Sequence, residues 1–166
     1  CQFISHVDHA FLQEAAQRRM QGKTTTFYVC CGPRRPNTFW ASPAAEPVWL
    51  GLYAAANGLD GFLRWAFVNW PRDPLYDSSF GPWPAGDTFL LYPGPRASVR
   101  WELLRDGIEE AEKIRLLRAE KAVTPALADL LAQYDFKRAE KSDAAALDAL
   151  VERTRQAVQQ AAAALR

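Results

Sequence analysis

Residues 61–70 read Gly61-Phe-Leu-Arg-Trp-Ala-Phe-Val-Asn-Trp70, and Pro71-Arg-Asp-Pro74 follows. Nearly every residue from Phe62 to Val68 is apolar or aromatic, which is typical of a strand that is buried on both faces. We therefore predict a central strand of a parallel sheet at this point. Ligands of parallel α/β folds bind at the carboxyl ends of the strands, so this stretch also indicates where to expect a site.

The residues at the end of this predicted strand suit a sugar. Asn69 and Trp70 close the run, and Asp73 follows the proline. An indole stacks on the apolar face of a sugar ring. An amide donates hydrogen bonds to the hydroxyls and accepts them, and a carboxylate accepts them. Trp65 and Trp70 are also consistent with side chains that only fill a core, and both interpretations stay open.

Composition excludes two classes of partner. The 166 residues carry a net charge of +1, which favours neither nucleic acid nor an acidic membrane surface. No apolar run reaches membrane-spanning length. A hydrophobic fraction of 49% is ample for a core, and 6 Trp are typical of carbohydrate-active proteins. The chain begins inside an apparent strand, so we expect a fragment, and its localisation stays open between secreted, periplasmic and cytoplasmic.

Cysteine and motif patterns exclude several kinds of site. The chain has 3 Cys, of which Cys30 and Cys31 are adjacent, and this is no disulfide framework. No Cys/His spacing resembles a zinc site, and we expect neither metal nor cofactor. A nucleophile elbow and a phosphate-binding loop are also absent. Cys30 and Cys31 are predicted to be small buried hydrophobic residues.

The rest of the chain alternates strands with helices. The predicted strands are 1–7, 24–31, 61–68 and 88–92, and the predicted helices are 9–21, 42–57 and 98–118. This order predicts parallel βαβ units, and four such units are half of an eight-stranded barrel. A half barrel exposes two sheet edges, so we expect the missing half, a partner chain or another cover. Residues 69–87 form a proline-rich loop of the length that is usually functional.

Local signals set the helix ends. Asp8, Ser42 and Ser98 are the predicted N-caps, and Gly22 and Gly58 are the predicted C-terminal stops. From residue 119 the composition changes to Ala, Gln and charged residues. We therefore divide the chain into 1–118, the C-terminal half of the barrel, and 119–166, a helical extension that packs on the body or on another chain.

The helical extension has its own start signals. Thr124 opens a short helix before a proline, and Ser142 opens a last helix that runs to the end. Its apolar seam is predicted to consist of Leu147, Leu150, Val151, Val158 and Leu165. No residue of this extension has the character of a catalytic group.

Two arginines follow the second predicted strand. Arg34 and Arg35 are suited to clamp a carboxylate, sulfate or phosphate. The alternative, which we favour, is that they pair with loop acids and hold the loops. These acids are Asp73, Asp77 and Asp87.

Arg64 lies inside the apolar run. An unpaired buried charge is very costly, so we expect an inward-facing Arg64 that pairs with an acid from a neighbouring strand.

Glycoside hydrolysis usually needs two carboxyl groups, and the loop acids would supply them only if the loop folded inward.

Four ordered segments resemble the motifs of one family. The segments are Thr25–Thr38, Tyr53–Ala66 with Asn69-Trp70, Asp87–Gly94 and Arg100–Glu110. Over roughly residues 1–118 the chain resembles the catalytic domain of glycoside hydrolase family 123 and its uncharacterised bacterial relatives. The resemblance implies a (β/α)8 barrel, of which this chain would be the C-terminal half.

The resemblance also implies a β-N-acetylgalactosaminidase-like hydrolase that uses substrate assistance. In such enzymes the 2-acetamido oxygen of the substrate attacks the anomeric carbon, and an adjacent Asp-Glu pair orients the amide and protonates the leaving group. No Asp-Glu dipeptide occurs in these 166 residues, and in the family the pair lies upstream of the matched segments. We therefore assign no catalytic residue to this chain. The candidate substrate-binding residues are Tyr28, Trp65, Asn69, Trp70, Asp73 and Tyr92.

Two functions from different classes stay open. The chain is either part of a hexosaminidase-like hydrolase, inactive as a fragment, or a non-catalytic carbohydrate-binding or scaffolding module. The expected partners are a glycan that contains N-acetylhexosamine and either the N-terminal half of the barrel or a second copy that pairs through the sheet edges.

Overall fold

The computed structural model of this chain describes residues 1–94 and 96–165. The strands are β1 (Gln2–Phe3), β2 (Thr26–Val29), β3 (Gly61–Arg64), β4 (Leu91–Tyr92) and β5 (Arg96–Ala97). A 3-10 turn, η1 (Ile4–His6), follows β1. The helices are α1 (His9–Met20), α2 (Ala45–Ala56), α3 (Val99–Ala119), α4 (Pro125–Leu131), α5 (Phe136–Lys141) and α6 (Ala144–Ala163).

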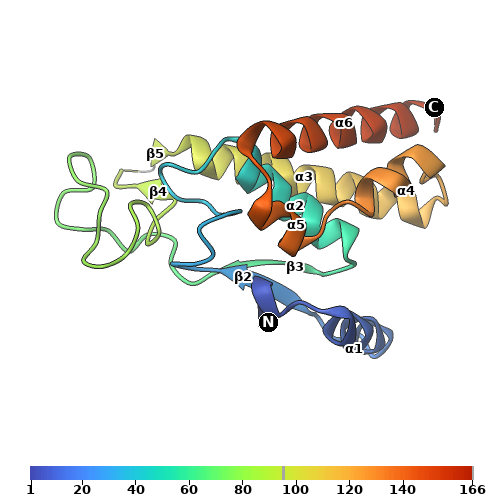
Figure 1. The fold of residues 1–166 in the computed structure, drawn as a ribbon, viewed down its shortest axis with the longest axis horizontal. Helices are drawn as coiled ribbons and strands as arrows, with labels where there is room; N and C mark the ends of the chain where they lie inside the picture. Colours follow the sequence, from blue (N-terminus) through green and yellow to red (C-terminus); the bar gives the residue numbers. More distant parts are fainter. Residues whose placement is uncertain (95, 166) are drawn as a thin grey trace.

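The first three strands form the predicted parallel sheet, in the order β1-β2-β3. α1 connects β1 to β2 and α2 connects β2 to β3, so the βαβ alternation is confirmed for these three strands (Figure 1). The molecule is therefore a mixed α/β fold with a small parallel sheet. No helix within residues 1–94 and 96–165 combines the length and apolarity needed to cross a bilayer.

The prediction of a strand buried on both faces at 62–68 was wrong. β3 ends at Arg64, and within the described residues it pairs with β2 alone. Leu63 is 47% exposed and Trp65 is 41% exposed. The apolar run does not pack as a central strand because helices cover one face of this sheet and no described strand covers its outer edge.

The register divides the side chains of the sheet between two faces. Phe27 and Val29 are fully buried, and the Phe27 ring lies 5.0 Å from that of Tyr53 on α2. Tyr28 alternates with them and pairs with Leu63, so these two side chains point to the opposite face. We call this the uncovered face. It carries aromatic and apolar side chains that are only partly buried.

The predicted fourth parallel strand at 88–92 was also wrong. Residues 67–69 and 88–90 run antiparallel instead, since Asn69 N donates to Thr88 O at 3.0 Å and Leu90 N donates to Phe67 O at 2.9 Å. β4 then forms an antiparallel pair with β5. These backbone hydrogen bonds compete with a parallel pairing to β3. Figure 1 shows the segment between β3 and β4 extending away from the helices.

Two of the three predicted N-caps are confirmed. Asp8 accepts a hydrogen bond from Phe11 N at 2.9 Å, and Ser98 accepts one from Trp101 N at 3.1 Å. The predicted stops also hold, because Gly22 and Gly58 adopt φ values of +71° and +64°, which favour glycine.

The third N-cap prediction, Ser42, was wrong. α2 begins at Ala45, and the Ser42 hydroxyl accepts from Phe39 N at 3.1 Å inside the preceding loop. Pro47 is the third residue of α2. A capping side chain usually accepts a hydrogen bond from the backbone N–H of the second or third residue, and proline has no N–H to donate.

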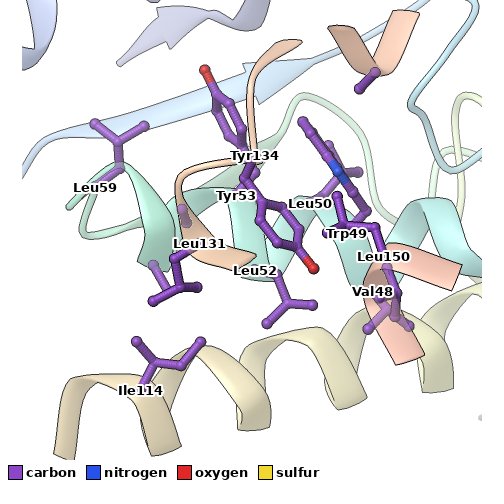
Figure 2. Packing of buried hydrophobic residues seen from close by; sticks show 14 of the residues in the cluster. Val48, Trp49, Leu50, Leu52, Tyr53, Leu59, Ile114, Leu131, Tyr134 and Leu150 are labelled. Atoms are coloured by element: carbon purple, nitrogen blue, oxygen red, sulfur yellow. The ribbon is translucent and has the colours of Figure 1, made fainter. Parts of the chain in front are cut away.

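The core is built around α2, which is buried over most of its length. Figure 2 shows Trp49 and Tyr53 from this helix beside Tyr134. Trp49 stacks on Tyr53 at 4.9 Å and on Tyr134 at 5.6 Å. α2 and α3 cross where Gly51 meets Gly107.

The helical extension packs on this core. The buried residues of α6 include Leu147, Leu150, Val151 and Val158, which are four of the predicted seam residues. The fifth, Leu165, is 52% exposed. Its N-cap is Asp143 rather than Ser142, and α5 is a helix that the sequence analysis did not predict. Figure 1 shows α6 running along α2 and α3.

Candidate functional site

A buried ion pair lies at the carboxyl end of β3. Arg64 Nη2 donates to Asp87 Oδ1 at 2.6 Å and to the Asp87 carbonyl at 2.5 Å. The two side chains are 5% and 0% exposed. The prediction of a paired Arg64 is confirmed, although the acid comes from the loop before β4 and not from a strand.

Arg64 lies on the helix-covered side of the sheet. Its register partner is Val29, which is fully buried, and Arg64 Nη1 donates to the Val29 carbonyl at 3.2 Å. Arg64 therefore anchors Asp87 and the end of the long loop. The prediction that Arg64 faces inward was wrong, since its side chain lies on the helix-covered side and does not share the uncovered face with Tyr28. Desolvation by burial lowers the pKa of Arg64, and the Asp87 carboxylate opposes this shift.

A second buried network holds the loop between β2 and α2. Asn37 Nδ2 donates to the Cys30 carbonyl at 3.0 Å and to the Pro33 carbonyl at 2.7 Å. Glu46, fully buried in the first turn of α2, accepts from Asn37 N at 2.9 Å and from Arg35 Nε at 2.7 Å.

The favoured interpretation, that both arginines pair with loop acids, was wrong for Arg34, which forms no ion pair within the described residues. For Arg35 it was right in kind and wrong in partner. Arg35 holds a loop by pairing with Glu46, and not with Asp73, Asp77 or Asp87. A carboxylate inside the apolar run of α2 was the signal that the sequence analysis missed, because a buried acid requires a partner.

Arg100 is a further buried arginine that the sequence did not reveal. Its Nη1 donates to the Thr38 carbonyl at 2.8 Å and to the Gly86 carbonyl at 2.7 Å. The guanidinium lies 5.5 Å from the centre of the Phe89 ring. Its position in the first turn of α3 is typical of an exposed residue, so no local pattern marks it.

Tryptophans gather in the loop beyond β3. The rings of Trp65 and Trp83 lie 5.5 Å apart at an interplanar angle of 57°. Trp70 donates its indole N–H to the Leu91 carbonyl at 2.7 Å, which ties the loop to β4. Trp65 and Trp70 are 41% and 39% exposed, so neither is enclosed in a core within the described residues.

The other candidate residues lie at separate points in β2, in β4 and in the loop that follows β3. Tyr28 is on the uncovered face, and its ring lies 5.2 Å from that of Phe3. Tyr92 follows Leu91 in β4, so the backbone places it next to the anchor of Trp70. Asn69 and Asp73 are exposed in the loop. Within the described residues, none of the six candidates lines the pockets described below.

The loop acids differ in their surroundings. Asp87 is committed to Arg64, while Asp77 is exposed and accepts hydrogen bonds from the Ser79 hydroxyl and backbone N–H. These bonds hold the pKa of Asp77 below its usual range. The part of the chain that the structure describes contains no group of three or more His, Cys, Asp and Glu side chains able to hold a metal.

The adjacent cysteines lie at the end of β2, and the prediction that both are buried was wrong. Cys31 is exposed and Cys30 is half-buried, with the two sulfur atoms 3.8 Å apart. Desolvation, followed by the hydrogen bond with Cys30, raises the pKa of the Cys31 thiol. Cys31 also lines a pocket of about 350 Å³ together with Arg34 and Phe39.

Comparisons with known proteins identify the family of this chain and a solved structure with a similar fold. Residues 3–117 match the family model described as glycoside hydrolase 123, catalytic domain. The fold resembles that of a family 123 glycoside hydrolase from Clostridium perfringens, described for glycolipid glycan hydrolysis, with a TM-score of 0.83 and 24% identity. That alignment covers 98% of this chain and 32% of the other chain. No curated protein sequence matched.

The class that these findings define is the glycoside hydrolases. The chain belongs to glycoside hydrolase family 123, within its catalytic domain. It spans about a third of the length of the Clostridium perfringens protein.

Proposed function

We propose that this chain forms part of the sugar-binding wall of an enzyme that releases β-linked N-acetylgalactosamine. The match of residues 3–117 to the family 123 catalytic domain carries this proposal. The partly exposed Trp65 and Trp70, which follow the end of β3, support it. Their rings offer the flat apolar surface on which a sugar stacks.

The proposed mechanism is substrate assistance. The substrate's acetamido oxygen forms a bond to the anomeric carbon as the glycosidic bond breaks, and an acid gives its proton to the leaving oxygen. Water then opens the cyclic intermediate. The Asp-Glu pair that orients the amide and supplies this proton would come from outside these 166 residues, since they contain no such dipeptide.

The chain's own contribution is to bind the sugar. Trp65 and Trp70 stack on the ring, Asn69 and Asp73 bind hydroxyls, and Tyr28 and Tyr92 complete the wall. This assignment follows from their positions at the carboxyl ends of the strands and in the loops that continue from them.

We further propose that residues 1–118 are the C-terminal half of a (β/α)8 barrel and that 119–166 are its helical extension. The consecutive parallel strands β1, β2 and β3 support this arrangement. The uncovered face would then point into the barrel, against the N-terminal half. If the chain is produced alone, the open strand edges favour self-association, which sedimentation velocity would detect.

The test uses the complete protein that contains this chain. A chromogenic β-N-acetylgalactosaminide should be hydrolysed, while the matching β-galactoside, which lacks the acetamido group, should not. Equal turnover of both substrates would contradict substrate assistance. Turnover of neither would contradict the proposed hydrolase.

The second candidate is a non-catalytic carbohydrate-binding or scaffolding module, which the partly exposed Trp65 and Trp70 support equally well. This candidate predicts saturable binding of the glycan, measured by calorimetry, without release of the chromophore. Binding that Trp70→Ala abolishes, in a protein with no turnover, would favour it over the hydrolase.

A further inference from the structure

Two adjoining pockets lie beside the loop that follows β2. One has a volume of about 280 Å³ and the other of about 350 Å³. They share three lining residues, Arg34, Phe39 and Ala41. Arg34 therefore belongs to the walls of both, beside an aromatic ring.

The charges around these pockets do not cancel. The charged lining residues are Arg34, Arg35 and Glu46. Arg35 Nε donates to Glu46 Oε1 at 2.7 Å, so these two compensate each other. Within the described residues Arg34 forms no ion pair. One positive charge is left without a carboxylate partner.

Other donors face the same space. The Ser42 hydroxyl lines the smaller pocket and accepts from Phe39 N at 3.1 Å, which leaves its own hydrogen available as a donor. Arg35 Nη2 is buried and has no hydrogen-bond partner among the described residues. The N-terminus of α2 also borders this pocket, and it has no side-chain cap. Its helix dipole favours negative charge.

The larger pocket is lined in part by the long loop that carries Trp83. Pro84 and Ala85 line it, and Trp83 directly precedes them in the chain. The Trp83 ring lies 5.5 Å from that of Trp65. The larger pocket and the tryptophan pair therefore share the segment 83–85 of the long loop, which connects the space beside Arg34 to the proposed sugar-binding wall.

We propose that Arg34 binds a carboxylate or sulfate group carried by an acidic glycan. This inference rests on the proposed function, because it extends the sugar-binding wall by one anion subsite. Arg34 is the ligand of the anion, and Arg35 is a positioning residue that Glu46 holds in place.

The test compares three substrates of the complete protein at constant ionic strength. They are a neutral glycan ending in N-acetylgalactosamine, its sulfated form, and a form that carries a carboxylate sugar. We expect at least one acidic form to be preferred in kcat/KM by about tenfold, typical of a contact to a charged group. The sulfated and carboxylated arms identify which anion is recognised.

Variants assign this preference to its residue. Arg34→Gln should bring the acidic-to-neutral ratio close to one and leave the neutral glycan unchanged. Arg34→Lys should keep part of the preference, because it keeps the charge and loses the planar fork. Lys137→Gln on α5 removes one charge away from both pockets and should change nothing.

The outcomes separate the two proposals. No acidic preference in the wild type, or a preference that Arg34→Gln leaves intact, would overturn the anion subsite while neutral turnover still supports the hydrolase. Where no glycan is cleaved, the same ratios are measured as dissociation constants by calorimetry. Failure to bind any of the three glycans would overturn both.

Discussion

At the scale of single residues, Arg64 and Asp87 connect the sheet to the long loop. Their ion pair is 2.6 Å long and nearly inaccessible to water. Removing one member of a buried pair leaves the other charge buried and uncompensated, which is more costly than the loss of an exposed pair. Loop position and stability are therefore coupled at this pair.

We predict that Asp87→Asn lowers the free energy of unfolding by about 3 kcal/mol, the usual cost of breaking a buried pair. Urea denaturation followed by circular dichroism measures this change. Asp77→Asn is the matched control, because Asp77 lies in the same loop and is exposed. Equal, small effects of both substitutions would show that the pair does not hold the loop.

Cys31 gives a prediction that depends on pH. Partial desolvation and the Cys30 hydrogen bond raise the pKa of its thiol, so a smaller fraction is thiolate at any given pH than in an ordinary thiol. Because the thiolate is the nucleophile, alkylation by iodoacetamide should be slow at neutral pH and reach its half-maximal rate at a higher pH than glutathione.

Peptide mass spectrometry after timed alkylation measures this rate at Cys31 alone. Cys30→Ala removes the hydrogen bond, one of the named causes, and should move the pH profile of Cys31 back toward that of glutathione. A wild-type profile at or below that of glutathione would contradict the assigned environment.

At the scale of elements, the crossing of α2 and α3 is set by glycine. A Cβ atom on Gly51 would lie 2.3 Å from the backbone carbon of Gly107, much closer than atoms can approach. The two helices must separate to admit it. This close approach sets the position of α2 relative to α3, and it therefore constrains the loop that leads into α2.

We predict that Gly51→Ala destabilises the protein by about 3 kcal/mol or more, at the upper end of overpacking costs. Gly61→Ala is the control, since its added Cβ would meet only Thr26 Cγ2 at 3.8 Å. Thermal unfolding of both variants checks this difference. A Gly51→Ala protein as stable as Gly61→Ala would show that the helices cross elsewhere.

The sequence predicted those elements whose signals are local. Asp8, Ser98 and Thr124 cap the helices that they were expected to cap, because each side chain bonds the backbone three residues ahead. The 61–70 run was wrongly predicted to be buried on both faces, because the sequence of an apolar run does not show whether its second face is covered or open. No local pattern encodes which loop segment pairs with residues 67–69.

In the candidate site, too, the sequence predicts features that have local signals and does not predict those that depend on long-range contacts. The place of Trp70 at the end of the apolar run can be read from the sequence, which left its exposure open. The partners of Arg35 and Arg100 come from other segments of the chain. Glu46 and the carbonyls of Thr38 and Gly86 meet these arginines only after the chain has folded. Long-range contacts of this kind leave no spacing in the sequence.

At the scale of the whole molecule, family membership and the uncovered face lead to the same proposal. Residues 3–117 match a hydrolase catalytic domain, and the sheet presents Tyr28 and Leu63 on its uncovered face. In the proposed (β/α)8 barrel, the rest of a larger protein would cover this face. The tryptophans of the long loop would then stand at its rim.

The most direct test of this proposal is the kinetics of Trp70 variants in the complete protein, with a chromogenic β-N-acetylgalactosaminide. Trp70→Ala should lower kcat/KM by roughly tenfold, the value of one lost stacking contact. Trp70→Phe should keep most activity, because it keeps a ring and loses only the bond to the Leu91 carbonyl. Trp40→Ala, at a tryptophan that is 66% exposed, should have no effect. Unchanged kcat/KM in Trp70→Ala would contradict the proposed sugar-binding wall.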